Sequence, residues 1–161
     1  PDMVINVIRE SGVNPENLEL EITETILMEQ SSSIVNVLLK LKALGIHISL
    51  DDFGTGYSSL SYLQNLPIDT LKIDRSFINK LAFNGEQTNI IETILMLGSN
   101  LGMDVVAEGI ETVEQREKLQ KMKCSRGQGF LFSRPLEESA ITSLLLSLPG
   151  KTETVAPGGA S

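Results

Sequence analysis

The spacing of apolar residues along the chain changes repeatedly between two patterns. Short runs of alternating or continuous apolar residues are typical of strands, and apolar residues at every third or fourth position predict amphipathic helices. The first pattern predicts strands at residues 18–23, 47–53, 70–74, 104–109 and 127–132. The second predicts helices at residues 3–11, 59–66, 86–101, 111–122 and 137–148, with one more running from a cap at 31–33 to about residue 44.

This alternation predicts an α/β fold with parallel strands, which right-handed crossovers join through the helices. Five strands fit either an open sheet or part of an eight-unit barrel whose first strands lie upstream of residue 1. We expect a single domain over residues 1–148. The Pro-, Gly- and Ser-rich end, residues 149–161, is expected to be a mobile tail.

Charged side chains recur on one face of four predicted strands, opposite the apolar neighbours in the same strand. They are Glu21, Asp51, Lys72 and Glu108, and each lies near the C-terminal end of its strand. Such charges are costly in a covered strand unless they are paired or bind an ion. Separate structural ion pairs would explain any one of them. Their recurrence favours a shared polar site at the strand ends, where parallel α/β folds place active sites.

Adjacent carboxylates, Asp51 and Asp52, end an apolar run just before a turn with Gly54 and Gly56. Hard divalent cations prefer carboxylate oxygens, so this pair suits a metal site. The formal charge of -8 and a pI near 4.7 argue against binding to a nucleic-acid backbone, and DNA is not an expected partner. A bound cation would let an anionic ligand bind locally despite that charge.

Cellular location is constrained by three observations. No stretch approaches the roughly 20 apolar residues of a membrane span. The first residues lack the basic and apolar regions of a secretory signal. The single Cys124 cannot form an internal disulfide, fits a reducing compartment and is expected to be a buried structural thiol. We therefore expect a soluble, cytoplasmic domain, which could also be the cytoplasmic part of a larger membrane-anchored protein.

Five short motifs together strongly resemble the EAL-domain family of cyclic di-GMP phosphodiesterases over residues 2–138. In the family's order and spacing they are Glu21-Ile22-Thr23-Glu24, Asp51-Asp52-Phe53-Gly54-Thr55-Gly56, Leu71-Lys72-Ile73-Asp74, Val106-Ala107-Glu108-Gly109-Ile110-Glu111-Thr112 and Gly127-Gln128-Gly129-Phe130. The resemblance implies a TIM-type barrel that uses Mg²⁺ or Mn²⁺ to hydrolyse one phosphodiester bond of cyclic di-GMP, with linear pGpG as the product.

Site residues follow from the same resemblance, position by position. Glu21, Asp51 and Asp52 match metal ligands, with Asp51 able to bridge two ions. Lys72 matches the lysine that holds or activates the attacking water. Glu108 matches a carboxylate assigned to the metal site or to general-base catalysis. Two ions held in this way could clamp the attacking and leaving oxygens of an in-line displacement. A plain salt bridge is the alternative role for Lys72.

Further positions match the substrate side of the family's site. Gln128, Asp74 and Arg134 are expected to bind the nucleotide, although a surface arginine before a helix would explain Arg134 almost as well. Glu24 matches the glutamate that anchors loop 53–59, which orders the metal site and contributes to dimer contacts. A merely tight turn is the alternative for that loop.

The sequence also departs from the family pattern, because it contains neither the Glu-Ala-Leu motif nor the asparagine ligand of the following strand. The first two strands of the domain are therefore expected to be absent. Two missing ligands would weaken cation binding and leave the isolated chain with little or no hydrolytic activity. Two exposed barrel edges would favour a homo-oligomer.

The motifs bear on four functional classes. The chain is either the catalytic portion of a phosphodiesterase or a non-catalytic EAL-like module that binds the nucleotide or a protein. A protein kinase, suggested by Asp52-Phe53-Gly54, lacks the phosphate loop and catalytic loop of that class. An unrelated metal-dependent barrel enzyme would need to reproduce all five motifs by chance.

Overall fold

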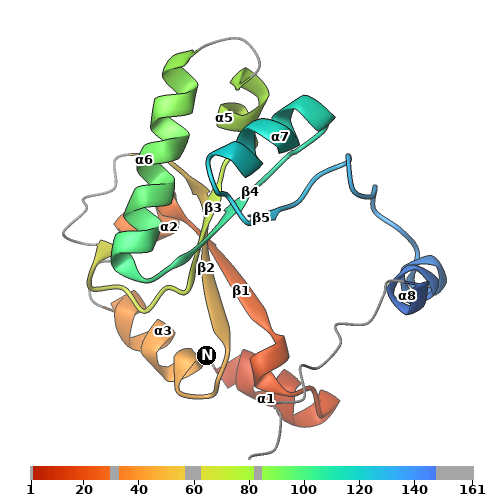
Figure 1. Cartoon of the computed structure of the whole chain (residues 1–161). Coiled ribbons are helices and arrows are strands. Elements are labelled where there is room, and N and C mark those ends of the chain that lie inside the picture. The colour runs from red at the N-terminus through yellow and green to blue at the C-terminus, as the bar shows by residue number, and fades with distance from the viewer. Residues whose placement is uncertain (1, 30–32, 57–62, 82–84, 148–161) are drawn as a thin grey trace, which may run out of the picture.

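A computed structural model describes residues 2–29, 33–56, 63–81 and 85–147 (Figure 1). Its centre is a parallel sheet in which the strand order β1-β2-β3-β4-β5 follows the chain order. Every crossover therefore moves one strand in the same direction, as in the wall of a TIM-type barrel. The strands are β1 (Glu19–Thr23), β2 (His47–Phe53), β3 (Thr70–Ile73), β4 (Asp104–Ala107) and β5 (Arg126–Gly127).

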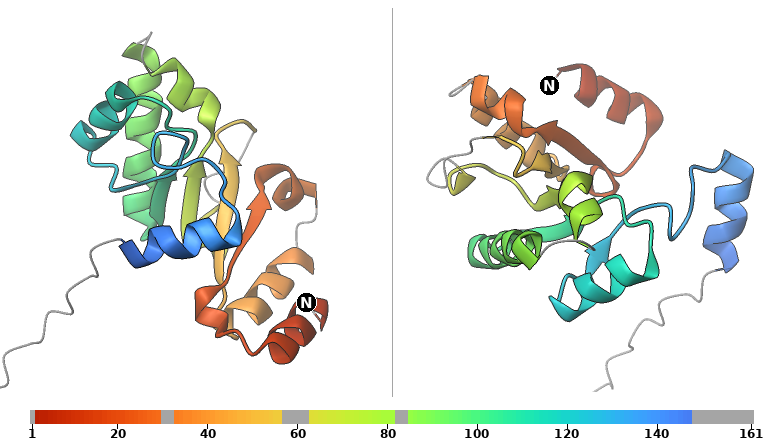
Figure 2. Two further views of the ribbon diagram at one scale, coloured as in Figure 1. Left: turned by 90° about the vertical axis from the view of Figure 1, so that its right-hand side faces the viewer. Right: turned by 90° about the horizontal axis from the view of Figure 1, so that it is seen from above.

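Helices occupy most of the connections between these strands. They are α1 (Asp2–Ser11), α2 (Glu24–Glu29), α3 (Ser33–Lys42), α5 (Arg75–Lys80), α6 (Gly85–Leu101), α7 (Val113–Lys121) and α8 (Glu138–Ser147), with a short 3₁₀ turn at Pro15–Asn17. In Figure 2, α3 and α6 cover one side of the sheet, and α8 lies on the other side. None of the helices in the described ranges is long and apolar enough to cross a membrane.

The core lies between the sheet and its covering helices. All four residues of β3 are buried, and the apolar side chains of Ile48 and Leu50 on β2 are fully buried. Helices contribute Leu38 and Leu41 from α3 and Ile91 from α6. Since burial of such a side chain stabilises a fold by about 1.5–3 kcal/mol, this layer holds the strands whose C-terminal ends carry the site.

The predicted α/β fold is confirmed, and most predicted elements lie within two or three residues of their observed positions. The strand predicted at 127–132 is wrong beyond residue 127, because the chain turns there with hydrogen bonds from the Phe132 and Ser133 N–H groups to the Gly129 carbonyl. Helices α2 and α5 were not predicted, since six residues make fewer than two helical turns and so show no repeated apolar spacing. The first half of the helix predicted at 59–66, and the tail at 149–161, lie outside the described residues. Of residues 63–66 only Leu63 is helical.

Candidate active site

The four strand charges that parity predicts to share a face do meet in space, around the side chain of Lys72. Its Nζ lies 2.6 Å from Glu21 Oε1, 2.7 Å from Glu108 Oε1 and 3.2 Å from Asp51 Oδ1. The lysine side chain is only 6% exposed, whereas the Glu21 side chain is 52% exposed. Four different segments, β1, β2, β3 and the end of β4, therefore contribute one charged group each to a single cluster.

The carboxylates keep Lys72 in its charged form. Burial favours loss of the ammonium proton, but hydrogen bonds to Glu108 and Glu21 outweigh it, and the pKa of Lys72 lies above its ordinary value. A lysine in that state cannot accept a proton from water. It can donate a hydrogen bond to an attacking oxygen and offset negative charge on a substrate.

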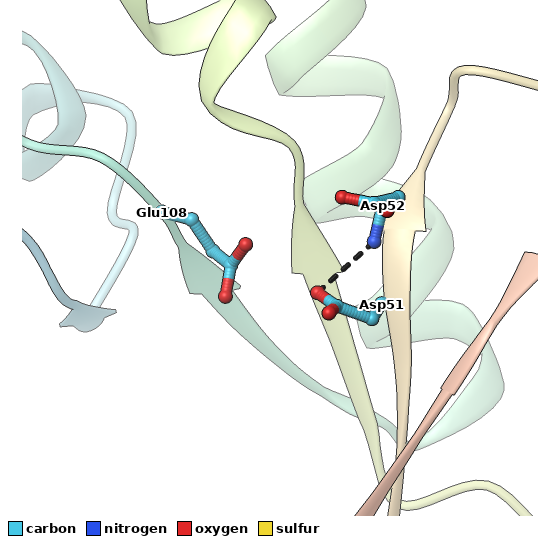
Figure 3. Close-up of side chains that lie close together, drawn as sticks. All are labelled: Asp51, Asp52 and Glu108. Carbon is cyan, nitrogen blue, oxygen red and sulfur yellow. Dashed lines mark hydrogen bonds between the residues drawn. The ribbon is translucent and has the colours of Figure 1, made fainter.

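Asp51, Asp52 and Glu108 form the group best placed to hold a metal ion, with one carboxylate oxygen from each within 4.8 Å of the others (Figure 3). Adjacent strand residues normally point to opposite faces, but the β2–β3 register shifts between Leu50 and Phe53. Asp52 also adopts a φ of 55°, which is uncommon for a residue other than glycine. This local irregularity brings both aspartates to the site.

This carboxylate group carries an excess of negative charge. Burial raises the pKa of Glu108, and Asp51 and Glu21 add to that effect against the opposing influence of Lys72. Burial also raises the pKa of Asp52, together with the nearby Asp51 and Asp74. Three oxygen donors that repel one another fit a hard divalent cation such as Mg²⁺ or Mn²⁺. Glu21, the fourth predicted ligand, lies against Lys72 and outside this group.

Glu24 is placed where a loop anchor is required. Its side chain is buried, and its Oε2 accepts hydrogen bonds from the backbone N–H groups of Gly54 at 3.2 Å and Gly56 at 3.1 Å. A Cβ at position 56 would lie 2.8 Å from Glu24 Oε1, so a larger residue there would displace the carboxylate. The contacts hold the start of the loop that follows Asp52, and residues 57–59 of that loop lie outside the described residues.

A cavity of about 740 Å³ opens beside the carboxylates. The predicted residues Asp52, Asp74, Glu108, Gln128 and Arg134 all line it. Sequence reasoning missed Arg75 and Phe130 as lining residues and also missed two apolar residues of α8, Ile141 and Leu144. The only available signal for Arg75 was its position directly after Asp74 at a strand end.

Three of the lining residues have partners within the protein that define their geometry. Gln128 Nε2 donates a hydrogen bond to Glu108 Oε1 at 2.6 Å, which orients the carboxylate. The Arg134 guanidinium lies 4.8 Å from the centroid of the Phe130 ring. Asp74 also caps α5, through a hydrogen bond from the Ser76 N–H to Asp74 Oδ1 at 2.9 Å. Only part of the Asp74 carboxylate therefore remains for a ligand.

Comparison with known proteins identifies the origin of this arrangement. The sequence profile of the EAL domain matches residues 1–135. The chain belongs to the EAL-domain family. A bifunctional diguanylate cyclase/cyclic di-GMP phosphodiesterase, MucR of Pseudomonas aeruginosa, is 45% identical over 135 residues, which cover 84% of this chain and 20% of MucR.

Solved EAL structures share the fold. The MucR phosphodiesterase in complex with cyclic di-GMP superimposes with a TM-score of 0.84 at 44% identity, over 87% of this chain and 57% of that one. BlrP1 of Klebsiella pneumoniae with manganese and cyclic di-GMP gives a TM-score of 0.77 at 34% identity, over 83% of this chain and 34% of that one. The chain thus spans about a fifth of the curated relatives it matches, and its five strands are consistent with part of the EAL barrel.

His47 and Cys124 lie outside the cluster around Lys72. His47 Nδ1 lies 3.9 Å from Asp69 Oδ2, at the start of β2 and away from the carboxylates. Cys124 is a buried free thiol, and its Sγ donates to the Arg126 carbonyl at 3.3 Å. Neither observation places these residues in the active site.

Proposed function

We propose that this chain is the catalytic portion of a cyclic di-GMP phosphodiesterase, which hydrolyses cyclic di-GMP to linear pGpG with two divalent cations, Mg²⁺ or Mn²⁺. The observation that carries the proposal is the position of the charged Lys72 among Glu21, Asp51 and Glu108, beside three converging carboxylates. The EAL relatives named as cyclic di-GMP phosphodiesterases support the choice of substrate.

Asp51, Asp52 and Glu108 would hold the cations. Glu21 could join the ligands by rotating away from Lys72, because its side chain is half exposed. Bound cations would stabilise the charge on the phosphate oxygens and make water a stronger nucleophile. Without these charges the carboxylates would repel the substrate, which is why the proposal requires metal.

The protein's own groups account for the attack of water on the phosphorus. Lys72 would donate a hydrogen bond to the attacking water and hold it in line with the phosphorus. Glu108, whose pKa is raised, is suited to accept the proton of that water. One P–O bond forms to the water oxygen as the bond to the ribose 3′-oxygen breaks, and the 3′-oxygen takes up a proton from solvent to give pGpG. Gln128 would orient Glu108, and Arg134 and Asp74 would bind the nucleotide.

The experiment that tests this proposal combines calorimetry and product analysis. Cyclic di-GMP is titrated into the protein with and without Mn²⁺, and pGpG is measured by chromatography. Asp51→Asn is expected to abolish metal-dependent binding and turnover. Asp104→Asn is the matched control, because Asp104 lies at the other end of its strand in an exposed ion pair with Arg126. Equal behaviour of the two variants would refute the assignment.

A non-catalytic EAL-like binding module is the second candidate function. It is favoured by the pairing of Glu21 with Lys72, which leaves three carboxylates in the metal group. The same experiment separates the two candidates, because a module of this kind would bind cyclic di-GMP without forming pGpG. We expect weak turnover by this chain alone.

We also propose that the chain self-associates, through loop 53–59 or through the edge strands β1 and β5. The exposed leucines of α8, including Leu145 and Leu146, add apolar surface that favours association. Light scattering after size exclusion is expected to give a multiple of the 17.6 kDa chain mass, and a single-chain mass would contradict this. The domain boundary at residue 148, the cytoplasmic location and the absence of DNA as a partner stay predictions.

A further inference from the structure

Gln115 on α7 is one of the few buried polar residues in the described ranges, and all of its side-chain polar atoms are used. The side chain is inside the fold, with the residue 6% exposed. Its Oε1 accepts hydrogen bonds from the N–H groups of Glu111 at 2.8 Å and Thr112 at 3.0 Å. Its Nε2 donates to the carbonyl of Ile78 on α5 at 3.3 Å. One amide thus joins the segment after β4 to the helix after β3.

Both of the joined pieces carry site residues. The segment 108–112 begins with Glu108 and includes Glu111, and α5 is preceded by Asp74 and begins at Arg75. All four line the cavity, whereas Gln115 does not. The amide therefore acts at a distance from the reacting groups, and any effect it has on the site must pass through the backbone.

A second close contact joins the same two pieces at their other end. Gly109 has a φ of 70°, and a Cβ built on it would lie 2.5 Å from the Cβ of Arg75. The backbone next to Glu108 therefore lies directly against the start of α5. With Gln115 at the far end, segment 108–112 contacts α5 at two points.

We propose that Gln115 is a positioning residue, which fixes segment 108–112 against α5 and so sets the position of Glu108 relative to Asp51 and Asp52. The inference rests on the proposed function, in which Glu108 is a metal ligand. Lys72 and the side-chain amide of Gln128 orient the Glu108 carboxylate through hydrogen bonds. Backbone hydrogen bonds from the Glu108 N–H to the Ile73 carbonyl and from the Ile110 N–H to the Gln128 carbonyl, both at 3.1 Å, hold residues 108–110. Gln115 holds the next two residues, Glu111 and Thr112, against α5. Metal ligands must hold their place within about 0.5 Å, so a shift of this backbone reduces metal affinity.

Gln115→Glu isolates the contact with α5. At pH 8 a glutamate there is ionised, because it still accepts the N–H groups of Glu111 and Thr112 at the start of α7, and the helix stays capped. The carboxylate cannot donate to the Ile78 carbonyl and would instead face its oxygen. Gln115→Ala removes both contacts. Leu119→Ala is the control, since Leu119 is a buried residue one turn further along the same helix.

The measurements are Mn²⁺ affinity by electron paramagnetic resonance, amide hydrogen exchange of peptides that span 108–112, and urea stability. We expect Gln115→Glu and Gln115→Ala to weaken Mn²⁺ binding about tenfold, as loss of groups that support metal ligands does. Exchange in 108–112 should rise in both variants. Leu119→Ala should lose stability but bind Mn²⁺ within about twofold of the wild type.

Two results would overturn the inference. One is a wild-type Mn²⁺ affinity in Gln115→Glu, and the other is an equal loss of affinity in Leu119→Ala at matched stability. If the wild-type chain binds no Mn²⁺, the proposed function fails. The positioning role is then tested by amide hydrogen exchange of residues 108–112 alone. Faster exchange at 108–112 in Gln115→Glu but not in Leu119→Ala would then support it, and equal exchange would reject it.

Discussion

Replacement of Lys72 by methionine tests the electrostatic logic of the site, because it removes the charge and keeps most of the side-chain volume. Removal of one partner of a buried ion pair costs about 3–5 kcal/mol. The Lys72 side chain is 6% exposed, but that of Glu21 is 52% exposed and its contribution is largely screened by solvent. We therefore expect Lys72→Met to lower the free energy of unfolding by about 3 kcal/mol in EDTA.

Divalent cations should reverse part of this loss, since Mn²⁺ and the Lys72 ammonium neutralise the same carboxylates. A tenfold tighter Mn²⁺ affinity in the variant would recover about 1.4 kcal/mol of the difference from the wild type. pGpG formation should nevertheless be lost, because water has no remaining ammonium donor. Metal would thus restore the stability of the variant in part without restoring its activity.

Urea unfolding, with EDTA and with saturating Mn²⁺, measures both effects. A loss of about 3 kcal/mol lowers the midpoint by about 1.5 M if m is about 2 kcal/mol per M. Lys121→Met is the matched control, because Lys121 is an exposed lysine in the last turn of α7, and the change should cost under about 1 kcal/mol. The reasoning is wrong if Lys72→Met is as stable as the wild type in EDTA, or if Mn²⁺ leaves the difference unchanged.

Three further predictions concern other groups. Glu24→Gln should weaken Mn²⁺ binding and speed amide exchange at Gly54 and Gly56, because a neutral amide oxygen accepts their N–H groups less strongly; unchanged exchange would contradict it. Mn²⁺ affinity should fall as the pH decreases through the raised pKa of Glu108, because protons then compete with metal. Calorimetry should show a smaller pH dependence for Glu108→Gln than for the wild type, and the remainder comes from Asp52, whose pKa is also raised. Asp69→Asn should lower urea stability by about 1–3 kcal/mol near neutral pH. The difference in stability between Asp69→Asn and the wild type should shrink in acid, because the pKa of Asp69 is lowered and the stability that its charged carboxylate contributes is lost as the pH falls through that pKa. Mn²⁺ affinity should not change.

The sequence predicted those parts of the fold in which one local pattern suffices. β2 was predicted to the residue, because its apolar run is bounded by Gly45 on one side and Gly54 on the other. The last strand was predicted too long, since Phe130 and Phe132 continue the alternation of a strand although hydrogen bonds to Gly129 turn the chain. Tertiary contacts decide such a segment, and they leave no periodic signal in the sequence.

The candidate site divides in the same way. Strand parity was enough to predict that Glu21, Asp51, Lys72 and Glu108 meet, because the face to which a strand residue points depends only on its position along the strand. Parity alone sends Asp52 away from Asp51, and the irregular register of β2 could not be predicted. The contact of Gln115 with α5 was also invisible, since a helical pattern does not say which polar residue will be buried.

Lys72 and the divalent cations compete for the same oxygens, and this competition links the two candidate functions of the chain. While Glu21 neutralises Lys72, the metal group has three carboxylates, and a bound cation must complete its coordination with water. An added oxygen ligand near β1 would strengthen metal binding without any change in the cluster itself. The strand that carries Glu-Ala-Leu in the EAL family would supply such a ligand, so a longer chain that contains it should bind Mn²⁺ more tightly than this one. Equal affinities would mean that the carboxylates of β2 and β4 already define the metal site.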